Sequence, residues 1–344
     1  MMNIVLIEFN SHHDECLYSQ VAFLKSIPNV KLYLVCNYRL KDRIGYLEAF
    51  DETLFVRSNQ WGVGHLRILS FFKANTINKV IFNTIGNKSV ANLLQICSKN
   101  RRDYFGVLHN LTQLKKPLFT FRYGKVTSIY VLNDYLLEAT ERYTPTHAKF
   151  ESFYPIYFHK HNQVDVVKAK GEIWITIAGK MEKGRRDYLR LLESYKRERL
   201  KNTIKLIFLG RCDPDIRSEF ESCNTNNNCV FWNGYVTNDV FHSYLQKTDY
   251  LLPLIHGNHD TAKAYRDKIS GSFNLAFSYH IPMIMDSFFY EFEDFKTTAL
   301  FYTPKDDLIQ ILNDVTRPVN KYTNNKWTFE FQRDRFISFL SRSF

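Results

Sequence analysis

Residues 172–188 read EIWITIAGKMEKGRRDY, an apolar run followed by a turn that holds two glycines and four cations. The run Glu172–Ala178 is typical of a buried strand. Within Tyr188–Tyr195, apolar residues then recur at the i, i+3, i+4 and i+7 spacing of a helix face. A strand that passes through a turn into a helix opens a parallel βαβ unit, because parallel strands require a crossover connection. The stretch therefore indicates an α/β fold.

The same alternation of apolar runs and helical spacing extends in both directions along the chain. The strands expected before residue 150 are Asn3–Phe9, Lys31–Cys36, Lys79–Asn83, Tyr104–Leu108 and Ser128–Leu132. From residue 172 onward they are Glu172–Ala178, Ile204–Leu209, Cys229–Trp232, Tyr250–Leu254 and Pro282–Met285. We expect two Rossmann-like domains whose parallel sheets face each other across a cleft.

The expected domains cover residues 1–150 and 172–315 of the 344-residue chain. Residues 151–171 belong to a stretch, starting at Thr144, that has two prolines and little periodicity, so we expect an interdomain segment there. Residues 316–344 end in an expected helix, Trp327–Phe344, which can cross back to the first domain. In open α/β sheets ligands bind beyond the carboxyl ends of the strands, so the loops at those ends are the candidate sites.

Composition excludes several protein classes. Hydrophobic residues make up 45% and charged residues 24%, which rules out a wholly disordered or collagen-like chain. No run of 18 apolar residues occurs, and Met1–Phe9 lacks a basic leader, so we expect neither a transmembrane helix nor a signal peptide. The six cysteines are scattered without a C-x-x-C pair, which favours a reducing compartment, the cytoplasm, and no structural metal.

The net charge of +11 is concentrated in the first part of the chain. Residues 1–150 carry 19 Lys and Arg against 11 Asp and Glu, whereas the remaining residues carry 27 against 24. A basic domain is typical of proteins that bind nucleic acid, an anionic membrane surface or an anionic substrate. Charge alone does not choose among these partners.

A second candidate anion-binding stretch is Lys268–Phe273, which reads KISGSF and opens an expected helix. Small residues at a helix start leave unpaired backbone N–H groups, and this end of the helix dipole attracts phosphate. Lys268 adds a point charge. The alternative is an ordinary serine cap at Ser270.

The order of these motifs resembles the nucleotide-sugar-binding half of glycosyltransferases with the GT-B fold, especially the large retaining class. The matching features between Glu172 and Asp286 are the GKMEKGRR turn, Leu209-Gly210-Arg211, Asn233-Gly234-Tyr235-Val236 and the Ser270-Gly271-Ser272 helix start. The first domain is similar only in its pattern of strands and helices. The resemblance implies a metal-independent enzyme that uses a nucleotide-sugar as its substrate and needs no cofactor.

The resemblance also implies roles for individual residues. The donor diphosphate would be held by Lys180, Lys183, Arg185, Arg186, Lys268, Ser270, Gly271 and Ser272. The nucleobase and ribose would contact Arg211, Tyr235, Val236 and Asp267, and the donor sugar would contact His259 and Asp260. Cations and a helix start can stabilise the charge that develops on a nucleoside diphosphate leaving group.

One feature departs from the retaining class. That class carries two glutamates separated by seven residues before a G-x-P turn, and counting back from Pro282 places these positions at Asp267 and Leu275. Asp267 can replace the first glutamate, but Leu275 cannot hydrogen-bond a ribose. His280 stands in place of the glycine. The sequence thus leaves open whether the reaction retains or inverts the anomeric configuration.

The first domain supplies the candidate catalytic groups. His12, His13 and Glu15 follow the first expected strand, and an imidazole beside a carboxylate suits acid–base chemistry near neutral pH. His109 follows another strand and would face the same cleft. The alternative is helix capping by Ser11 or Asp14, with His12 and His13 exposed. No histidine pair has the i, i+4 spacing of zinc enzymes, so we expect no metal.

The segment Lys115–Lys125, KKPLFTFRYGK, interleaves cations with aromatic rings. Such a loop can rest on an anionic bilayer that presents a lipid-linked acceptor. It can also stack single-stranded nucleic acid, or simply pack its rings inward.

The sequence therefore predicts a cytoplasmic glycosyltransferase, or one bound to the inner face of the membrane. It would move a sugar from a nucleotide-diphosphate donor, most simply a UDP-sugar, to a glycan or lipid-linked glycan in surface-polysaccharide synthesis. The alternatives are a nucleotide-sugar epimerase of the same fold and a non-catalytic basic protein that binds carbohydrate or nucleic acid. We expect no nucleic-acid partner, because no recognisable binding module is present.

Overall fold

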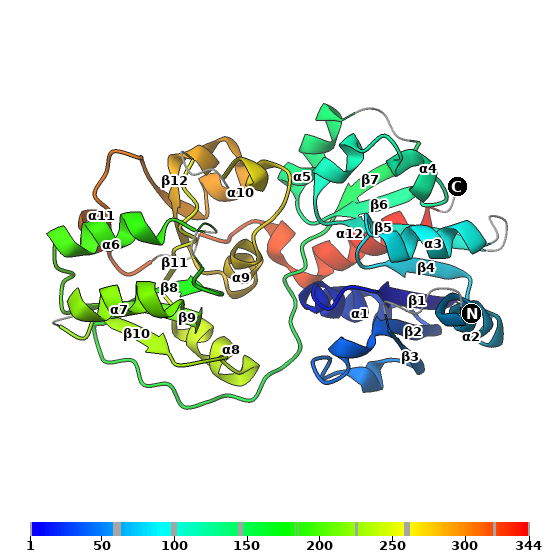
Figure 1. Cartoon of the computed structure of the whole chain (residues 1–344), viewed down its shortest axis with the longest axis horizontal. Coiled ribbons are helices and arrows are strands. Elements are labelled where there is room, and N and C mark those ends of the chain that lie inside the picture. The colour runs from blue at the N-terminus through cyan, green and yellow to red at the C-terminus, as the bar shows by residue number, and fades with distance from the viewer. Residues whose placement is uncertain are drawn as a thin grey trace. The chain divides into compact units, whose positions relative to one another are not determined.

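The computed structural model describes residues 2–57, 63–97, 102–143, 147–182, 184, 186–223, 226–257, 262–318 and 321–342. Contacts divide the chain into two compact units (Figure 1). Unit 1 comprises Met1–His159, Asp267–Ile269 and Asn325–Phe344. Unit 2 comprises Lys160–Arg266 and Ser270–Asn324. The chain therefore passes between the units at more than one place, and its last helix belongs to unit 1.

Unit 1 contains a seven-stranded sheet in the order β3-β2-β1-β4-β5-β6-β7. Every neighbouring pair is parallel, with Ile4 of the first strand beside Leu32 on one side and Lys79 on the other. The strands are β1 Met2–Glu8, β2 Val30–Asn37, β3 Glu52–Val56, β4 Lys79–Phe82, β5 Asp103–Leu108, β6 Ser128–Val131 and β7 Lys149–Ser152. The helices are α1 Leu17–Lys25, α2 Val63–Ala74, α3 Lys88–Ile96, α4 Phe119–Tyr123, α5 Asp134–Ala139 and α12 Phe329–Ser341.

Aromatic packing fixes α12 against the body of unit 1. The rings of Tyr130 on β6 and Phe336 on α12 stack with their centroids 4.4 Å apart. The Tyr130 hydroxyl also donates a hydrogen bond to the Phe336 carbonyl at 2.7 Å. Phe23 of α1 and Phe153 pack against the same ring of Phe336. Rings of this size bury much apolar area, so they account for the return of the chain to unit 1.

Unit 2 contains a six-stranded parallel sheet in the order β10-β9-β8-β11-β12-β13. Its strands are β8 Ile173–Ala178, β9 Ile204–Arg211, β10 Cys229–Trp232, β11 Tyr250–Leu251, β12 Met283–Asp286 and β13 Ala299–Tyr302. Its helices are α6 Tyr188–Arg197, α7 Pro214–Cys223, α8 Asn238–Lys247, α9 Gly271–Tyr279, α10 Glu293–Lys296 and α11 Leu308–Asp314. Leu191, Leu192 and Tyr195 of α6 are buried in the core formed with β8 and β9, as their helical spacing predicts.

Both sheets have the Rossmann strand order, in which the fourth strand lies beside the first and the chain then builds outward on that side. The strand order reverses between β1 and β4 in unit 1, and between β8 and β11 in unit 2. Loops at the carboxyl ends of these strands are where such folds bind ligands. The α/β class and the two Rossmann-like sheets predicted from the sequence are confirmed.

Several elements differ from the prediction. Strands β3, β7 and β13 are absent from it, and β7 reads KFES, with polar side chains that hide the strand pattern. The expected strand Tyr250–Leu254 ends at Leu251. Leu254 has a φ of 53°, a left-handed conformation that no strand accommodates.

Candidate functional site

In unit 1, side chains from three neighbouring strand ends form a polar cluster at the switch point, which we call the histidine cluster: Glu8, His12, His13, Glu15, Asn83, Thr84 and His109. Glu8 is the last residue of β1, while Asn83 and His109 directly follow β4 and β5. The rings of His12 and His13 lie 4.3 Å apart, and those of His13 and His109 lie 4.2 Å apart. The structure thus brings together all four histidine and glutamate residues that the sequence nominated for catalysis.

The backbone of His13 adopts a left-handed conformation, with φ 72° and ψ 15°, just before a short 3-10 helix, Asp14–Cys16. A residue with a Cβ pays a steric cost in this region, and such strain tends to occur at functional sites. The predicted alternative was capping by Ser11 or Asp14, but the N-cap residues of the 3-10 helix and of α1 are His13 and Cys16, and neither side chain forms a cap hydrogen bond.

Glu15 is the partner of the His13 imidazole, with Nδ1 of His13 3.4 Å from Oε1 of Glu15. Burial alone would lower the pKa of His13, but the hydrogen bond and the negative charge of Glu15, together with Glu8, raise it above its ordinary value. Desolvation raises the pKa of Glu15, yet the contact with His13 outweighs it and holds that pKa below its ordinary value. The pair therefore stabilises a proton on His13.

His109 has the opposite electrostatic character. Its Nε2 lies 2.7 Å from the Asn83 carbonyl oxygen, which can only accept, so Nε2 carries the hydrogen. Desolvation, followed by the nearby charge of His13, lowers the pKa of His109 to about 3. His109 is therefore neutral at physiological pH, and its Nδ1 is an acceptor.

Glu8 was not nominated by the sequence, where it stands inside an apolar run and resembles an interruption of a strand. Its side chain is fully buried. Burial raises its pKa to about 7, although hydrogen bonds from Thr84, Asn10 and Asn83 act in the other direction. A carboxyl group that titrates near neutral pH at the end of β1 is a feature of functional sites.

In unit 2, the turn after β8, which we call the glycine loop, covers residues 179–187. Gly179 and Gly184 have φ of 102° and 78°, conformations open to glycine. Gly210 of β9 lies against this loop so closely that a Cβ there would be 2.4 Å from the Gly179 carbonyl oxygen. The glycines predicted to shape an anion-binding turn thus have that conformational role.

The cations of the glycine loop differ in their surroundings. Lys180 is half-exposed and pairs with Glu182 at 3.1 Å. Arg186 is buried, and its Nη1 has no hydrogen-bond partner among the described residues, while its Nη2 lies beside Gly179. Lys183 and Arg185, also predicted to bind the diphosphate, lie outside the described residues.

Asp187, the last residue of the glycine loop, and His256 connect this loop to the sheet at the switch point. Asp187 caps α6 by accepting a hydrogen bond from the Arg190 N–H, and its own N–H donates to the Leu254 carbonyl. The buried His256, in the loop after β11, places Nδ1 2.7 Å from the other oxygen of Asp187. The sequence offered no periodic signal for this pair, because its members are 69 residues apart.

The start of α9 is compatible with the predicted anion site. Ser270 is the N-cap residue but makes no side-chain cap bond, so it is not the ordinary serine cap considered above. Instead its hydroxyl lies 2.8 Å from that of Ser272, and both side chains are buried. A Cβ built on Gly271 would meet open space.

Asp267 and Lys268 belong to unit 1 by their contacts. The Asp267 carboxylate accepts hydrogen bonds from the Tyr143 hydroxyl at 2.5 Å and from Arg142 at 3.2 Å. The Lys268 carbonyl accepts one from Tyr135. His280, which replaces the glycine of the G-x-P turn, adopts a φ of 53° and stacks on Tyr322. It ends α9 in the conformation for which glycine is favoured.

The remaining predicted donor contacts lie on the surface or outside the described residues. Arg211 is exposed at the end of β9, and its carbonyl accepts a hydrogen bond from the N–H of Met181. Tyr235 is 80% exposed, whereas its neighbour Val236 is buried. His259 and Asp260 fall outside the described residues. Among the described residues, no group of three or more His, Cys, Asp or Glu is arranged to hold a metal ion.

No family model matches the chain, and no curated protein matches it. Similar solved structures cover the whole chain. They include the galactosyltransferase WaaB of the lipopolysaccharide outer core, with TM-score 0.64, 15% identity and 99% coverage of both chains. Anabaena HepE in complex with UDP and glucose has TM-score 0.66 and 11% identity over 100% of both chains. This chain has the GT-B fold.

The GT-B fold alone does not distinguish between reactions. A UDP-N-acetylglucosamine 2-epimerase is also similar, with TM-score 0.63 and 10% identity over 99% of this chain and 95% of that chain. None of the described helices is long and apolar enough to cross a membrane. The two candidate regions, the histidine cluster and the glycine loop, are therefore the basis for a functional assignment.

Proposed function

We propose that the chain is a glycosyltransferase that moves a sugar from a UDP-sugar to a hydroxyl of a glycan or lipid-linked glycan in surface-polysaccharide synthesis. The observation that carries the proposal is the histidine cluster, a neutral imidazole and a carboxylate-paired imidazole at the switch point of a GT-B unit. It gains support from WaaB, a galactosyltransferase, and from HepE, which is in complex with UDP and glucose.

In the proposed reaction His13 is the general base. Its imidazole takes the proton of the acceptor hydroxyl as that oxygen bonds to the anomeric carbon of the donor sugar. The bond between this carbon and the diphosphate oxygen breaks, and the nucleoside diphosphate leaves with the electron pair. Glu15 stabilises the imidazolium through its contact with Nδ1. Neutral His109 can accept a hydrogen bond from a substrate hydroxyl through Nδ1.

Unit 2 would bind the donor. Lys180 and Arg186, with Lys183 and Arg185 of the same loop, supply positive charge for the diphosphate. The N–H groups at the start of α9, beside Ser270 and Ser272, would bind phosphate oxygens through the positive end of the helix dipole. These groups can stabilise the leaving diphosphate without a metal ion, so we propose a metal-independent reaction with no cofactor.

Thermal unfolding and calorimetry test this function against UDP, GDP, CMP, ADP and their sugar conjugates, with and without a chelator. A ligand that binds the native state raises the unfolding midpoint. We expect selective stabilisation by one nucleotide that chelator leaves unchanged. No shift with any nucleotide at millimolar concentration would contradict the donor site, and loss of the shift with chelator would contradict metal independence.

The epimerase is the second candidate, because a UDP-N-acetylglucosamine 2-epimerase has the same fold. An epimerase converts the free donor without any acceptor. Incubation with the nucleotide-sugar that binds, followed by separation of the sugar products, distinguishes the two reactions. An epimerised donor in the absence of acceptor would favour the epimerase, whereas an unchanged donor that is consumed only with acceptor would favour the transferase.

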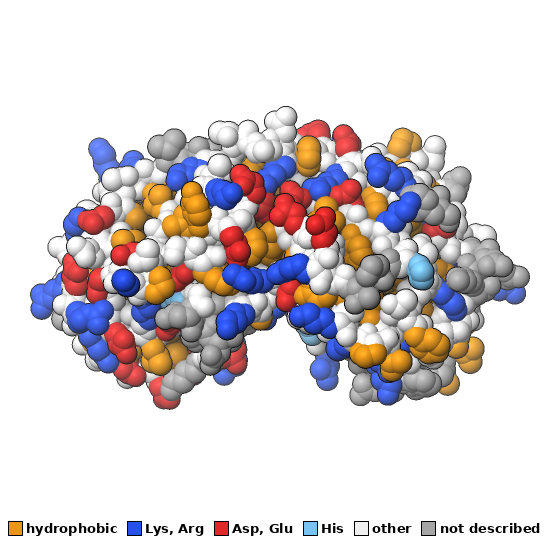
Figure 2. Space-filling view, turned by 90° about the horizontal axis from the view of Figure 1, so that it is seen from above, with side chains coloured by type: hydrophobic (Ala, Val, Ile, Leu, Met, Phe, Trp, Pro, Cys, Tyr) orange, Lys and Arg blue, Asp and Glu red, His pale blue; other side chains and the backbone are white. Residues whose placement is uncertain are grey.

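The surface around α4 supports a peripheral position on an anionic membrane. Phe121 is 80% exposed and Leu118 is 52% exposed, and the exposed side chains around them include Lys115, Lys116 and Arg122. The sequence contains no Asp or Glu from residue 104 to residue 133. On the face drawn in Figure 2, Lys and Arg side chains are interspersed with Asp and Glu. An apolar tip within an acid-free basic segment suits anionic headgroups and a lipid-linked acceptor at the cytoplasmic face.

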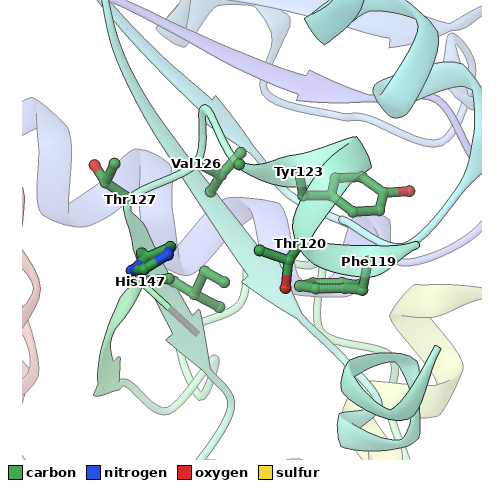
Figure 3. A pocket seen from close by; sticks show the side chains of 9 residues that line it. Phe119, Thr120, Tyr123, Val126, Thr127 and His147 are labelled. Atoms are coloured by element: carbon green, nitrogen blue, oxygen red, sulfur yellow. The ribbon is translucent and has the colours of Figure 1, made fainter. Parts of the chain in front are cut away.

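The other residues of α4 and the last cation of the segment have structural roles. Phe119, Thr120 and Tyr123 line a small pocket of about 40 Å³ together with Val126, Thr127 and His147 (Figure 3). The Lys125 amine donates to the carbonyls of Leu94, Gln95 and Cys97 at the end of α3. Lys125 is therefore not part of the proposed membrane contact.

Vesicle sedimentation tests the membrane contact. We expect binding to vesicles that contain phosphatidylglycerol and little binding to phosphatidylcholine alone, with Phe121→Ser weakening the former about tenfold. Phe331→Ser is the matched control, because Phe331 is an exposed phenylalanine on α12 of the same unit. Equal binding of both variants, or no binding of the native chain, would contradict the contact.

A further inference from the structure

The histidine cluster is organised by one buried residue, Asn83, that the proposed mechanism does not use. Asn83 has no exposed surface and directly follows β4. Its side-chain amide donates to Oε2 of Glu8 at 2.6 Å and to the His13 carbonyl at 2.8 Å. Its Oδ1 accepts a hydrogen bond from Gln20 of α1 at 2.5 Å. Both amide hydrogens and the amide oxygen are thus in use.

The backbone of Asn83 takes part as well. Its N–H donates to the Ile7 carbonyl of β1 at 2.8 Å, and its carbonyl accepts from Nε2 of His109 at 2.7 Å. One residue therefore joins β1, the loop that holds His13, α1 and the end of β5. Its amide orientation is determined by its partners, because a carboxylate and a carbonyl lie on one side and an amide donor lies on the other.

These contacts constrain the two imidazoles in different ways. The bond to the His13 carbonyl supports the left-handed backbone that orients the His13 ring. The bond from His109 fixes its tautomer and leaves Nδ1 as the acceptor. Glu8 holds the Asn83 amide in place, and its other oxygen accepts from the Asn10 N–H at 2.7 Å within the same loop. Thr84 donates to Glu8 at 2.6 Å.

We propose that Asn83 is a positioning residue that sets the geometry of His13 and the tautomer of His109, with Glu8 as the buried carboxyl group that orients it. The proposal rests on His13 acting as the base. A base that is displaced or free to reorient loses rate even when the substrate still binds, because proton transfer depends on hydrogen-bond geometry.

The positioning role of Asn83 can be tested through the titration of the His13 imidazole, because charged groups surround that ring. The titratable or charged groups that face His13 and Glu8 are His12, Asp14, Glu15, Cys16, Cys36, Arg43 and His109. Asp14 is paired with Arg43 at 2.6 Å. Glu15, then Glu8 and Asp14, are the groups that favour the protonated ring. Displacing His13 from Glu15, or neutralising Glu8, should lower its pKa.

The first experiment follows the imidazole ring protons by NMR as the pH is varied. The His13 signal is assigned by its absence in His13→Gln. Asn83→Ala removes the side-chain hydrogen bonds that position the His13 loop but keeps the Glu8 charge. Glu8→Gln removes that charge and keeps a side chain of the same shape. We expect both variants to lower the pKa of His13 by about half a unit or more. Asn92→Ala is the control, because Asn92 is a buried asparagine of α3 in the same unit.

The second experiment measures transfer with the nucleotide-sugar that binds. We expect Asn83→Ala to lower kcat about tenfold to a hundredfold while the KM of the donor is unchanged, since the donor groups belong to unit 2. If Asn83→Ala does not fold, Glu8→Gln decides the question by the shift of the His13 titration. A His13 titration in both variants equal to that in Asn92→Ala would overturn the proposal. If no transfer is found with any donor, the proposed function fails, and the NMR arm still decides the positioning role.

Discussion

Units 1 and 2 share one sheet order but place different kinds of residue at its switch point. In unit 1 the turn after β1 holds His13 in a left-handed conformation, with φ 72°, among titratable groups that include the buried Glu8. In unit 2 the turn after β8 places glycine in the corresponding conformation, with φ 102° at Gly179, among cations. A strained histidine presents a side chain at the site, whereas a glycine presents backbone. This difference matches the proton transfer that we propose for unit 1 and the anion binding that we propose for unit 2.

The two sites also differ in the hydrogen bonding of individual buried polar groups. Asn83 satisfies its hydrogen-bonding groups within the histidine cluster. In unit 2 the Nη1 of Arg186 and the Nε2 of His256 are buried without a hydrogen-bond partner. Buried polar groups are normally satisfied, so unpartnered ones near a loop are candidates to interact with water or ligand. Asn83 is fully hydrogen-bonded in unit 1, although Oε1 of its neighbour Gln20 is buried without a partner among the described residues. Near the glycine loop of unit 2, Arg186 and His256 each have one polar atom still to be satisfied.

Replacing His13 tests the role of unit 1 and should have the largest effect. We expect His13→Gln to lower kcat about 10²- to 10⁴-fold, the usual contribution of a general base, with the affinity for nucleotide unchanged. Steady-state kinetics and calorimetry on the same preparation measure the two quantities. His65→Gln on α2 is the control for a histidine elsewhere in the unit. A loss of less than about fivefold in kcat would contradict the role of unit 1 in proton transfer.

Replacing Glu8 tests whether the histidine cluster contains a buried acid. The folded chain keeps the Glu8 proton up to a pKa of about 7, whereas the unfolded chain releases it near the ordinary glutamate pKa of 4.5. Stability should therefore fall as the pH rises from about 4.5 to 7, by at most about 3 kcal/mol. Glu8→Gln lacks this pH dependence. Its free energy of unfolding should therefore rise relative to that of the native chain as the pH rises over that range. Urea unfolding at pH 5 and pH 8 measures the difference, and equal differences at both values would contradict the buried acid.

Replacing Gly210 tests the backbone role of glycine in unit 2. The new Cβ of Gly210→Ala would lie 2.4 Å from the Gly179 carbonyl oxygen, so the glycine loop must shift. We expect the free energy of unfolding to fall by about 2 kcal/mol and nucleotide binding to weaken. Gly234→Ala is the control, because its Cβ would meet nothing within 4 Å. Thermal unfolding that shows the same midpoint for both variants would mean that the loop tolerates the side chain.

Replacing Lys180 should have the smallest effect. Its side chain is 51% exposed and already pairs with Glu182, so we expect Lys180→Ala to weaken nucleotide binding only about tenfold. Lys196→Ala removes an equally exposed lysine of α6 that pairs with Glu219. Calorimetry should show a loss for Lys180→Ala alone. An equal loss in both variants would point to net charge rather than to a specific contact, which would weaken the comparison between the units.

The catalytic candidates illustrate how far the sequence reached. His12, His13 and Glu15 could be nominated because they follow an apolar run closely, and parallel strands place their ends at one edge of a sheet. Glu8 could not, because a glutamate within NIVLIEF has no property in the sequence that distinguishes a buried acid from an edge-strand charge. Asn83 and His256 were missed as partners for a related reason. Their contacts join residues 63–75 and 69 positions apart, and no local pattern encodes such pairs.

The sequence by itself determined the α/β class, the two Rossmann-like series and the glycine turn after Glu172–Ala178. These follow from hydrophobic periodicity and from the conformational freedom of glycine, which are local properties of the chain. Only the tertiary structure decided which polar side chains meet at the switch points, because their hydrogen bonds join strands whose order is set by packing. It also decided that α12 returns to unit 1 and that Asp267 bonds to Tyr143. Local sequence thus specified the elements, and burial across distant elements specified the chemistry that they hold.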